Sequence, residues 1–340
     1  MNRIIVYVAS LTAAAAIIPA VPLLWGKAAD DKSAKDPKSV KIEEFIFDDV
    51  QYSDEPYKVL DISSGQVMEV PVRDYVIGAV CAEMPAVFEE EALKAQAVAA
   101  HTYAERQRRI SKNSENAELK GADFSNDTAK YQGYYTESRI KHYFGENFDE
   151  YYKKISDAAD EVMNYIITYD NEPIISAFHS MSSGTTESAE NIWGTKVDYL
   201  VPVDSSFDKS APKYEDEVTV DLNFMKTRLE EVFGASLGEN AEEWIIPAEI
   251  SDSGTILTAR VGDKTVTGND IRTALGLRSA DFEVKIGEDS AIFTTKGFGH
   301  GVGMSQYGAN SMASKGSNWR EILEHYYTGC TITKVGDDSL

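Results

Sequence analysis

The sequence predicts an α+β fold in which two central helices and mostly antiparallel strands form a cleft. Three observations carry this prediction. A helical pattern fills residues 73–111 and is broken once, at Pro85. Short segments of strand-forming residues, bounded by turn residues, lie on both sides of it. The chain has 340 residues, of which 43% are hydrophobic, so it is long enough for a substantial core.

The helical stretch divides into two helices. The first begins at about Arg73, and its apolar residues follow helical spacing: Val76, Ile77, Val80 and Met84. Pro85 ends it, because the residue before a proline is pushed out of the helical region. The second helix begins near Glu89 and carries a stripe of mostly small residues: Leu93, Ala97, Ala100 and Ala104. Small residues permit close packing, so we expect this helix at the centre of the fold.

Glu83 falls in the last turn of the first helix. The helix dipole is negative at that end and the last carbonyls lack partners, so an ionised carboxylate is disfavoured there. Its neighbours Cys81, Ala82 and Met84 are small or apolar. An exposed surface glutamate is the common alternative for this residue type. The neighbours instead indicate a raised pKa, which suits a general acid.

Other elements follow from local patterns. A hairpin is expected at Tyr57–Val70, and an amphipathic helix at Phe148–Met163. Strands are expected at Tyr165–Tyr169 and Ile174–His179, around a turn at residues 170–173. In residues 208–292 we predict secondary structure but no functional residues. The expected elements are a helix near 223–233, a hairpin at 256–266, a short helix near 269–275 and a strand at 282–286. A last helix is expected at Ser305–Ser314.

The N-terminus predicts a membrane anchor. Ile4–Trp25 is a run of 22 residues without a charge, flanked by Arg3 and Lys27, and it is long enough to span a bilayer. A cleaved signal peptide is the alternative, but the run is long for one. The predicted organisation is an anchor at 1–27, a polar linker at 28–40 and an extracytoplasmic folded region at 41–340.

The net charge of −23 argues against nucleic acid as a partner, because binding phosphates requires a basic surface. The same charge argues against docking on an anionic membrane face. A neutral ligand rich in sugar is compatible with it. An acidic surface that serves solubility alone is equally compatible.

Two polar blocks are suited to a sugar ligand. In Phe178–Gly194, hydroxyls and amides can hydrogen-bond ring substituents, and Trp193 can stack on a pyranose face. In Lys296–Asn310, four glycines within seven residues allow the backbone to approach a ligand closely, and His300 stands between two of them. Core positions for His179 and Trp193 remain alternatives.

These segments resemble a known family. E-M-P at residues 83–85, then E-A-L-K-A-Q-A-V-A-A-x-T-Y-A from Glu91 and G-x-G-H-G-V-G-M-S-Q-Y-G-A from Gly297, are similar to motifs of the Stage II sporulation protein D family, which includes amidase-enhancer proteins. The resemblance covers residues 57–331. It implies a peptidoglycan lytic transglycosylase whose catalytic glutamate falls on Glu83. Such an enzyme needs one acid, whereas a glycoside hydrolase typically uses two carboxylates.

The sequence departs from the family pattern at several positions. Met181 replaces a threonine, Ser183 a glycine and His101 an arginine. Ser125 and Tyr131 stand where some members carry zinc-binding cysteines, so we predict no metal and no cofactor. Cys81 and Cys330 match no redox or metal motif, and Cys81 is expected to be a buried thiol.

The resemblance and the residue chemistry together suggest a set of substrate-binding residues: Gln132, His179, Ser180, Ser182, Asn191, Trp193, His300, Gly301, Ser305 and Gln306. The expected partners are peptidoglycan glycan strands, a sporulation amidase and a membrane partner of the engulfment complex, with no nucleic acid. The expected location is the cell membrane, with one span and the catalytic region facing septal peptidoglycan. The alternative function is a non-catalytic module that binds glycan or activates an amidase.

Overall fold

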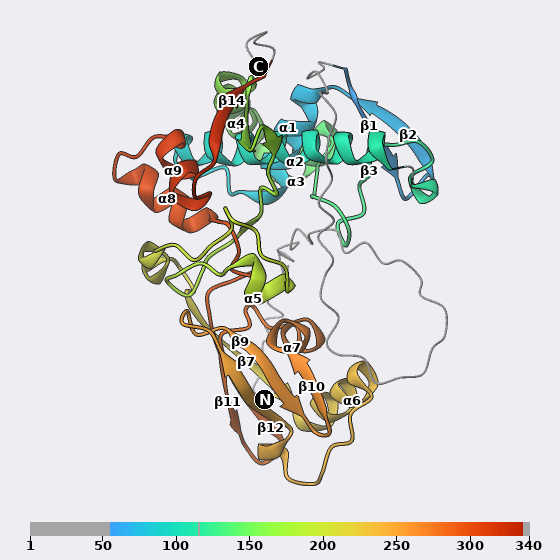
Figure 1. Ribbon diagram of the computed structural model, residues 1–340, viewed down its shortest axis with the longest axis vertical. Helices are drawn as coiled ribbons and strands as arrows, with labels where there is room; N and C mark the ends of the chain where they lie inside the picture. The colour runs from blue at the N-terminus through green and yellow to red at the C-terminus, as the bar shows by residue number, and fades with distance from the viewer. Residues whose placement is uncertain (1–54, 115, 336–340) are drawn as a thin grey trace, which may run out of the picture.

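The structure, a computed structural model, describes residues 55–114 and 116–335 (Figure 1). The predicted anchor and linker lie outside this part of the chain. Within it, no helix combines the length and apolarity needed to cross a membrane. The described residues form an upper body, rich in helices, and a lower body of antiparallel strands with two helices (Figure 1). Each body has its own hydrophobic core.

The predicted helix pair organises the upper body. Helix α1 spans Val72–Glu83 and α2 spans Glu90–Asn113, in agreement with the sequence prediction. Ala97, Ala100 and Ala104 are at most 1% exposed, so the stripe of small residues is buried as expected. Around α2 pack α1 and elements from later in the chain: α4 (Phe148–Val162), β4 (Tyr165–Tyr169), α8 (Gln306–Ser314) and α9 (Trp319–Tyr326). The central position of α2 is therefore confirmed.

Small sheets complete the upper body. The predicted hairpin is β1 (Tyr57–Asp61) with β2 (Gln66–Val70), and β3 (Phe124–Ser125) joins β1 in parallel. Strand β4 pairs antiparallel with β5 (Glu172–Pro173) and β14 (Thr331–Lys334). Shorter elements fill the connections: α3 (Glu137–Phe144), α5 (Ala189–Trp193) and the 3-10 turns η1 (Ala117–Leu119), η2 (Gly145–Asn147) and η3 (Ser206–Ser210). Cys81 is a buried free thiol, as predicted.

One predicted strand is much shorter than expected. Of Ile174–His179, only β6 (Phe178–His179) is a strand, and it pairs in parallel with β13 (Met304–Ser305). The preceding backbone bonds to unrelated partners: Ile174 N–H donates to the Ile167 carbonyl, and Ile175 N–H donates to the Tyr199 hydroxyl. Because these partners lie on different elements, no regular ladder forms. The parallel pair that remains joins the two polar blocks of the sequence.

The lower body carries two antiparallel sheets, which confirms the mixed α+β class with mostly antiparallel strands. One sheet orders β11 (Phe282–Ile286), β12 (Ser290–Lys296) and β7 (Glu215–Asp221), and the other β10 (Lys264–Thr267), β9 (Ile256–Val261) and β8 (Ile245–Ile250). Helices α6 (Leu222–Phe233) and α7 (Gly268–Leu275) cover them, with the 3-10 turn η4 (Ala241–Glu243). The core between them includes Leu229, Ile271 and Phe293.

Candidate active site

Glu83 is the last residue of α1, and three distant segments meet at it. The helix ends there because Met84 adopts an extended conformation ahead of Pro85. The Glu83 side chain is partly buried, and its Oε1 accepts a hydrogen bond from the Gly133 N–H at 3.1 Å. Its backbone carbonyl accepts from Gln306 Nε2 at 3.0 Å, and the same amide reaches Gln96 Oε1 at 3.3 Å. The first and last motifs of the sequence therefore converge on this acid.

The pKa of Glu83 is raised from 4.5 to about 8. Burial is the main cause, because it disfavours the charged form, and the Gly133 N–H partly opposes it by binding the carboxylate. The direction agrees with the sequence prediction. At neutral pH most of the carboxyl groups therefore carry a proton, as a general acid requires.

A polar cluster lies beside the acid. Gln132 is 2% exposed, its Oε1 accepts from the Tyr75 hydroxyl at 3.3 Å, and its N–H donates to the Tyr103 hydroxyl at 3.1 Å. Burial, with a smaller contribution from the Glu83 charge, raises the pKa of both tyrosines. Sequence reasoning did not select either tyrosine, although Tyr103 belongs to the quoted T-Y-A motif. Gln132 Nε2 has no hydrogen-bond partner among the described residues.

The β6–β13 pair brings the two polar blocks together around two histidines. The ring centroids of His179 and His300 are 5.8 Å apart, and the Trp193 ring lies 5.6 Å from that of His300. The Val302 carbonyl accepts from His179 Nδ1 at 3.1 Å, and the Val302 N–H donates to His300 Nδ1 at 3.1 Å. These bonds assign opposite tautomers to the two rings.

Both histidines are neutral at physiological pH. Burial lowers the pKa of His179 to about 4 and lowers that of His300 well below its usual value. Given the tautomers, His179 presents a bare Nε2 and His300 presents an Nε2–H. His179 Nε2 has no hydrogen-bond partner in the described part of the chain, whereas the His300 ring donates to the Phe178 backbone, which partly opposes the fall of its pKa. The pair thus leaves one ring acceptor, His179 Nε2, without a donor.

Ser182 and Ser305 lie in a buried network centred on Asp208, a residue that sequence reasoning missed. The N–H and hydroxyl of Ser182 both donate to Asp208 Oδ2 at 2.7 Å, and the Ser305 hydroxyl donates to Oδ1 at 2.8 Å. Burial raises the pKa of Asp208, and these bonds oppose the rise. The contacts give both serines a structural role, and their predicted contact with glycan stays a prediction. No motif in the sequence distinguished Asp208 from other loop acids.

Two of the remaining predicted residues, Asn191 and Gly301, contact another buried acid, Glu187. Asn191 is exposed, and its Nδ2 donates to Glu187 Oε2 at 3.0 Å. The Gly301 carbonyl accepts from the Glu187 N–H at 2.7 Å, and Gly301 has a φ of +80° that favours glycine. Ser180 is half-buried, and its carbonyl accepts from the Tyr307 N–H at 3.0 Å. Glu187 lies within the block Phe178–Gly194 but was not among the predicted site residues.

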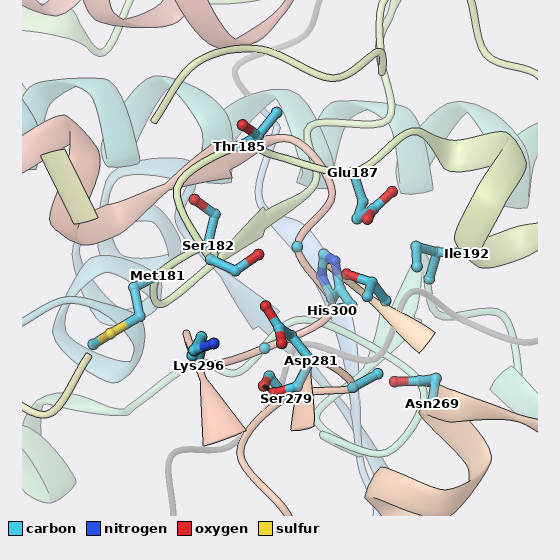
Figure 2. Close-up of a pocket in the computed structure, with 15 residues that line it drawn as sticks. Met181, Ser182, Thr185, Glu187, Ile192, Asn269, Ser279, Asp281, Lys296 and His300 are labelled. Carbon is cyan, nitrogen blue, oxygen red and sulfur yellow. Dashed lines mark hydrogen bonds between the residues drawn. The ribbon is translucent and has the colours of Figure 1, made fainter. Parts of the chain in front are cut away.

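A small pocket separates these loops from the lower body (Figure 2). Glu187, Asp281, Lys296 and His300 all contribute to its wall, and its volume of about 20 Å³ has room for one water molecule. Burial raises the pKa of Asp281 to about 6. Across the residues that the structure describes, no group of three or more His, Cys, Asp or Glu side chains could hold a metal ion.

Comparisons with known proteins agree with the motifs. A family model described as Stage II sporulation protein matches residues 62–169. Stage II sporulation protein D of Bacillus subtilis (strain 168) is 40% identical over 269 residues, which cover 79% of this chain and 76% of that protein. The protein of the same name from Bacillus amyloliquefaciens is 41% identical over 273 residues, 80% of this chain and 77% of the relative.

A more distant relative carries a different name. The protein named amidase enhancer, from Bacillus subtilis (strain 168), is 25% identical over 310 residues, covering 75% of this chain and 40% of that protein. The first two relatives are at least 40% identical to this chain, and the aligned residues cover most of both chains. The chain therefore belongs to the Stage II sporulation protein D family.

Proposed function

We propose that this protein is a peptidoglycan lytic transglycosylase that cleaves peptide-stripped glycan strands during engulfment of the forespore. The observation that carries the proposal is Glu83, a single acid whose pKa of about 8 keeps it protonated at neutral pH. Burial and the Gly133 N–H account for that pKa, with no contribution from a second carboxylate of the described chain.

One acid is sufficient for this reaction. Protonated Glu83 gives its proton to the leaving glycosidic oxygen as the bond to C1 of muramic acid breaks. The resulting carboxylate then takes the proton of the C6 hydroxyl, and O6 closes onto C1 to form a 1,6-anhydro end without water. The Gly133 N–H holds Oε1 at 3.1 Å through both steps. It stabilises the carboxylate that forms after the first step.

The neighbouring groups suit the binding of a sugar strand. The Gln132 amide is held by Tyr75, and its buried Nε2 has no partner among the described residues, next in the chain to the Gly133 N–H that binds the acid. Trp193 is half-buried against His300 and can stack on a pyranose ring. Gln306 ties the acid to the helix that follows β13, so it fixes Glu83 relative to the two histidines.

The test is digestion of peptide-stripped glycan strands by the full-length chain and by Glu83→Gln, with products identified by mass spectrometry. Anhydro-ended sugars from the wild type and none from the variant are the expected result. Reducing ends would instead indicate a hydrolase with a second carboxylate. Glycan binding by both proteins without cleavage would contradict an enzymatic role.

A second candidate is a glycan-binding module that activates an amidase, and the likeness to the protein named amidase enhancer favours it. The two roles are compatible, because an amidase that removes stem peptides would produce the stripped strands. We include such an amidase and a membrane protein of the engulfment complex among the proposed partners. Amidase turnover measured with and without Glu83→Gln distinguishes the roles, since activation without cleavage does not require the acid.

We also propose a single-pass location in the cell membrane, with the folded region outside the cytoplasm. The support is the uncharged run Ile4–Trp25 between Arg3 and Lys27. Protease added to intact protoplasts should degrade the folded region and leave a short membrane-bound fragment. Full protection of the chain would contradict this orientation.

A further inference from the structure

The Gly133 N–H, which binds Glu83, lies in a stretch of chain that is neither helix nor strand. Because a regular backbone ladder does not hold this stretch, its position depends on side chains. The preceding residue, Gln132, is bonded to both central helices. Its N–H donates to the Tyr103 hydroxyl of α2 at 3.1 Å, and its Oε1 accepts from the Tyr75 hydroxyl of α1 at 3.3 Å. The two hydroxyls thus hold the residue that determines where the Gly133 N–H lies.

The residues that follow pack closely on α1. The Tyr135 N–H donates to the Gly78 carbonyl at 3.0 Å, and a Cβ at Gly78 would lie 2.4 Å from the Tyr135 carbonyl oxygen. The Tyr134 ring stacks on the Tyr75 ring, with the two centroids 5.5 Å apart. These contacts leave the stretch little freedom on the side of α1. The bond to Tyr103 fixes it from the side of α2.

The two hydroxyls act on Glu83 through the chain that they hold. Among the described residues, both bond to Gln132 and neither bonds to the Glu83 carboxyl group. Burial raises the pKa of Tyr75 and Tyr103, with a smaller contribution from the Glu83 charge, so both stay protonated while Glu83 titrates. They therefore serve as neutral hydrogen-bonding groups and not as further acids or bases.

We propose that Tyr75 and Tyr103 are positioning residues that keep the Gly133 N–H directed at Glu83 Oε1. For its effect on cleavage, this inference rests on the proposed function. The N–H binds the ionised carboxyl group more strongly than the neutral one, because hydrogen bonds to charged acceptors are stronger. It therefore favours the carboxylate that exists between the donation of the first proton and the uptake of the second. An N–H that moves out of line stabilises this carboxylate less.

Loss of either hydroxyl should raise the pKa of Glu83 above its value of about 8, because the Gly133 N–H is the group that opposes the effect of burial. We expect this pKa to rise by about 0.5 to 1 in Tyr75→Phe and in Tyr103→Phe, and by more in the double variant. The same variants should lower kcat about three- to tenfold and change KM less than about twofold, because they alter the acid and not the binding of the strand.

The test follows the carboxyl group of Glu83 by NMR in the full-length chain in detergent, with glutamate labelled with ¹³C at the side-chain carboxyl. The Glu83 signal is the one that Glu83→Gln lacks, and its chemical shift is recorded against pH. The matched control is Tyr57→Phe, because Tyr57 is fully buried in the same core and its hydroxyl donates to Glu105 at 2.6 Å. This control should leave the pKa of Glu83 unchanged. The pH profile of kcat for strand cleavage, measured alongside, should move with the pKa in the two test variants.

Three results would overturn the proposal: a Glu83 pKa that is the same in both test variants as in the wild type, a rise of equal size in Tyr57→Phe, or a fall in kcat whose pH profile does not move. If Tyr75→Phe does not fold, Tyr103→Phe decides, because the Tyr103 side chain is only partly buried. The proposed function fails separately. Strands left intact by the wild type would refute cleavage while the rise of the pKa stood, and cleavage with an unchanged pKa in the variants would refute only the positioning role.

Discussion

The raised pKa of Glu83 makes the stability of the protein depend on pH in a predictable direction. The native state holds the proton up to about pH 8, whereas the unfolded chain releases it near 4.5. Between these values the native state binds more protons, so stability falls as pH rises. The interval spans about 3.5 units, which gives a limit of about 5 kcal/mol at about 1.4 kcal/mol per unit. Partial solvent access to the side chain reduces the expected loss to about 2–4 kcal/mol.

Glu83→Gln removes the titrating group and keeps its shape, so it isolates this effect. We expect the free energy of unfolding of the variant, minus that of the wild type, to rise by about 2–4 kcal/mol between about pH 4.5 and pH 9. Urea denaturation at a series of pH values measures it. In parallel, kcat/KM for strand cleavage should fall above about pH 8, as the acid loses its proton. Parallel stability curves for the two proteins would refute the assignment of a buried, proton-holding glutamate.

Further outcomes follow from the site geometry. Gly133→Ala places a Cβ 2.9 Å from Glu83 Oε1, so cleavage should fall at least tenfold in product assays, whereas Gly238→Ala, which adds a methyl in open space, should leave it unchanged. Asp208→Asn should lower the free energy of unfolding by about 2–4 kcal/mol in urea melts, because it disrupts a buried network that anchors two loops; a loss below half a kcal/mol would contradict that role. Trp193→Ala should weaken strand binding by about 1 kcal/mol or more in calorimetry, and unchanged affinity would assign the ring to packing alone.

The sequence was sufficient for elements with strong local signals. The helix pair, the first hairpin and α4 all carry periodic apolar residues. Some of their ends are also set by local sequence, as where Pro85 ends α1. Ile174–His179 was predicted as one strand because its residues are strand-forming. Its backbone instead bonds to Ile167, Tyr199 and β13, and such partners depend on tertiary structure that local propensity does not encode.

The candidate site likewise contains features that the sequence predicts and features that depend on tertiary contacts. Glu83 and its raised pKa followed from its place in a helix and its apolar neighbours. The hydroxyls of Ser182 and Ser305 looked available in the sequence, yet both are bonded to Asp208.

The bond from Gln306 to the Glu83 carbonyl spans 223 residues, and Phe178 of β6 pairs with Met304 of β13 across a shorter but still long part of the chain. Contacts between such distant segments form late in folding, because long loops must close first. During synthesis, a chain that has not yet reached residue 306 carries the acid without the helix that holds it in place. The proposed cleavage of glycan strands would therefore require the chain beyond residue 306, and products truncated before that residue would lack it.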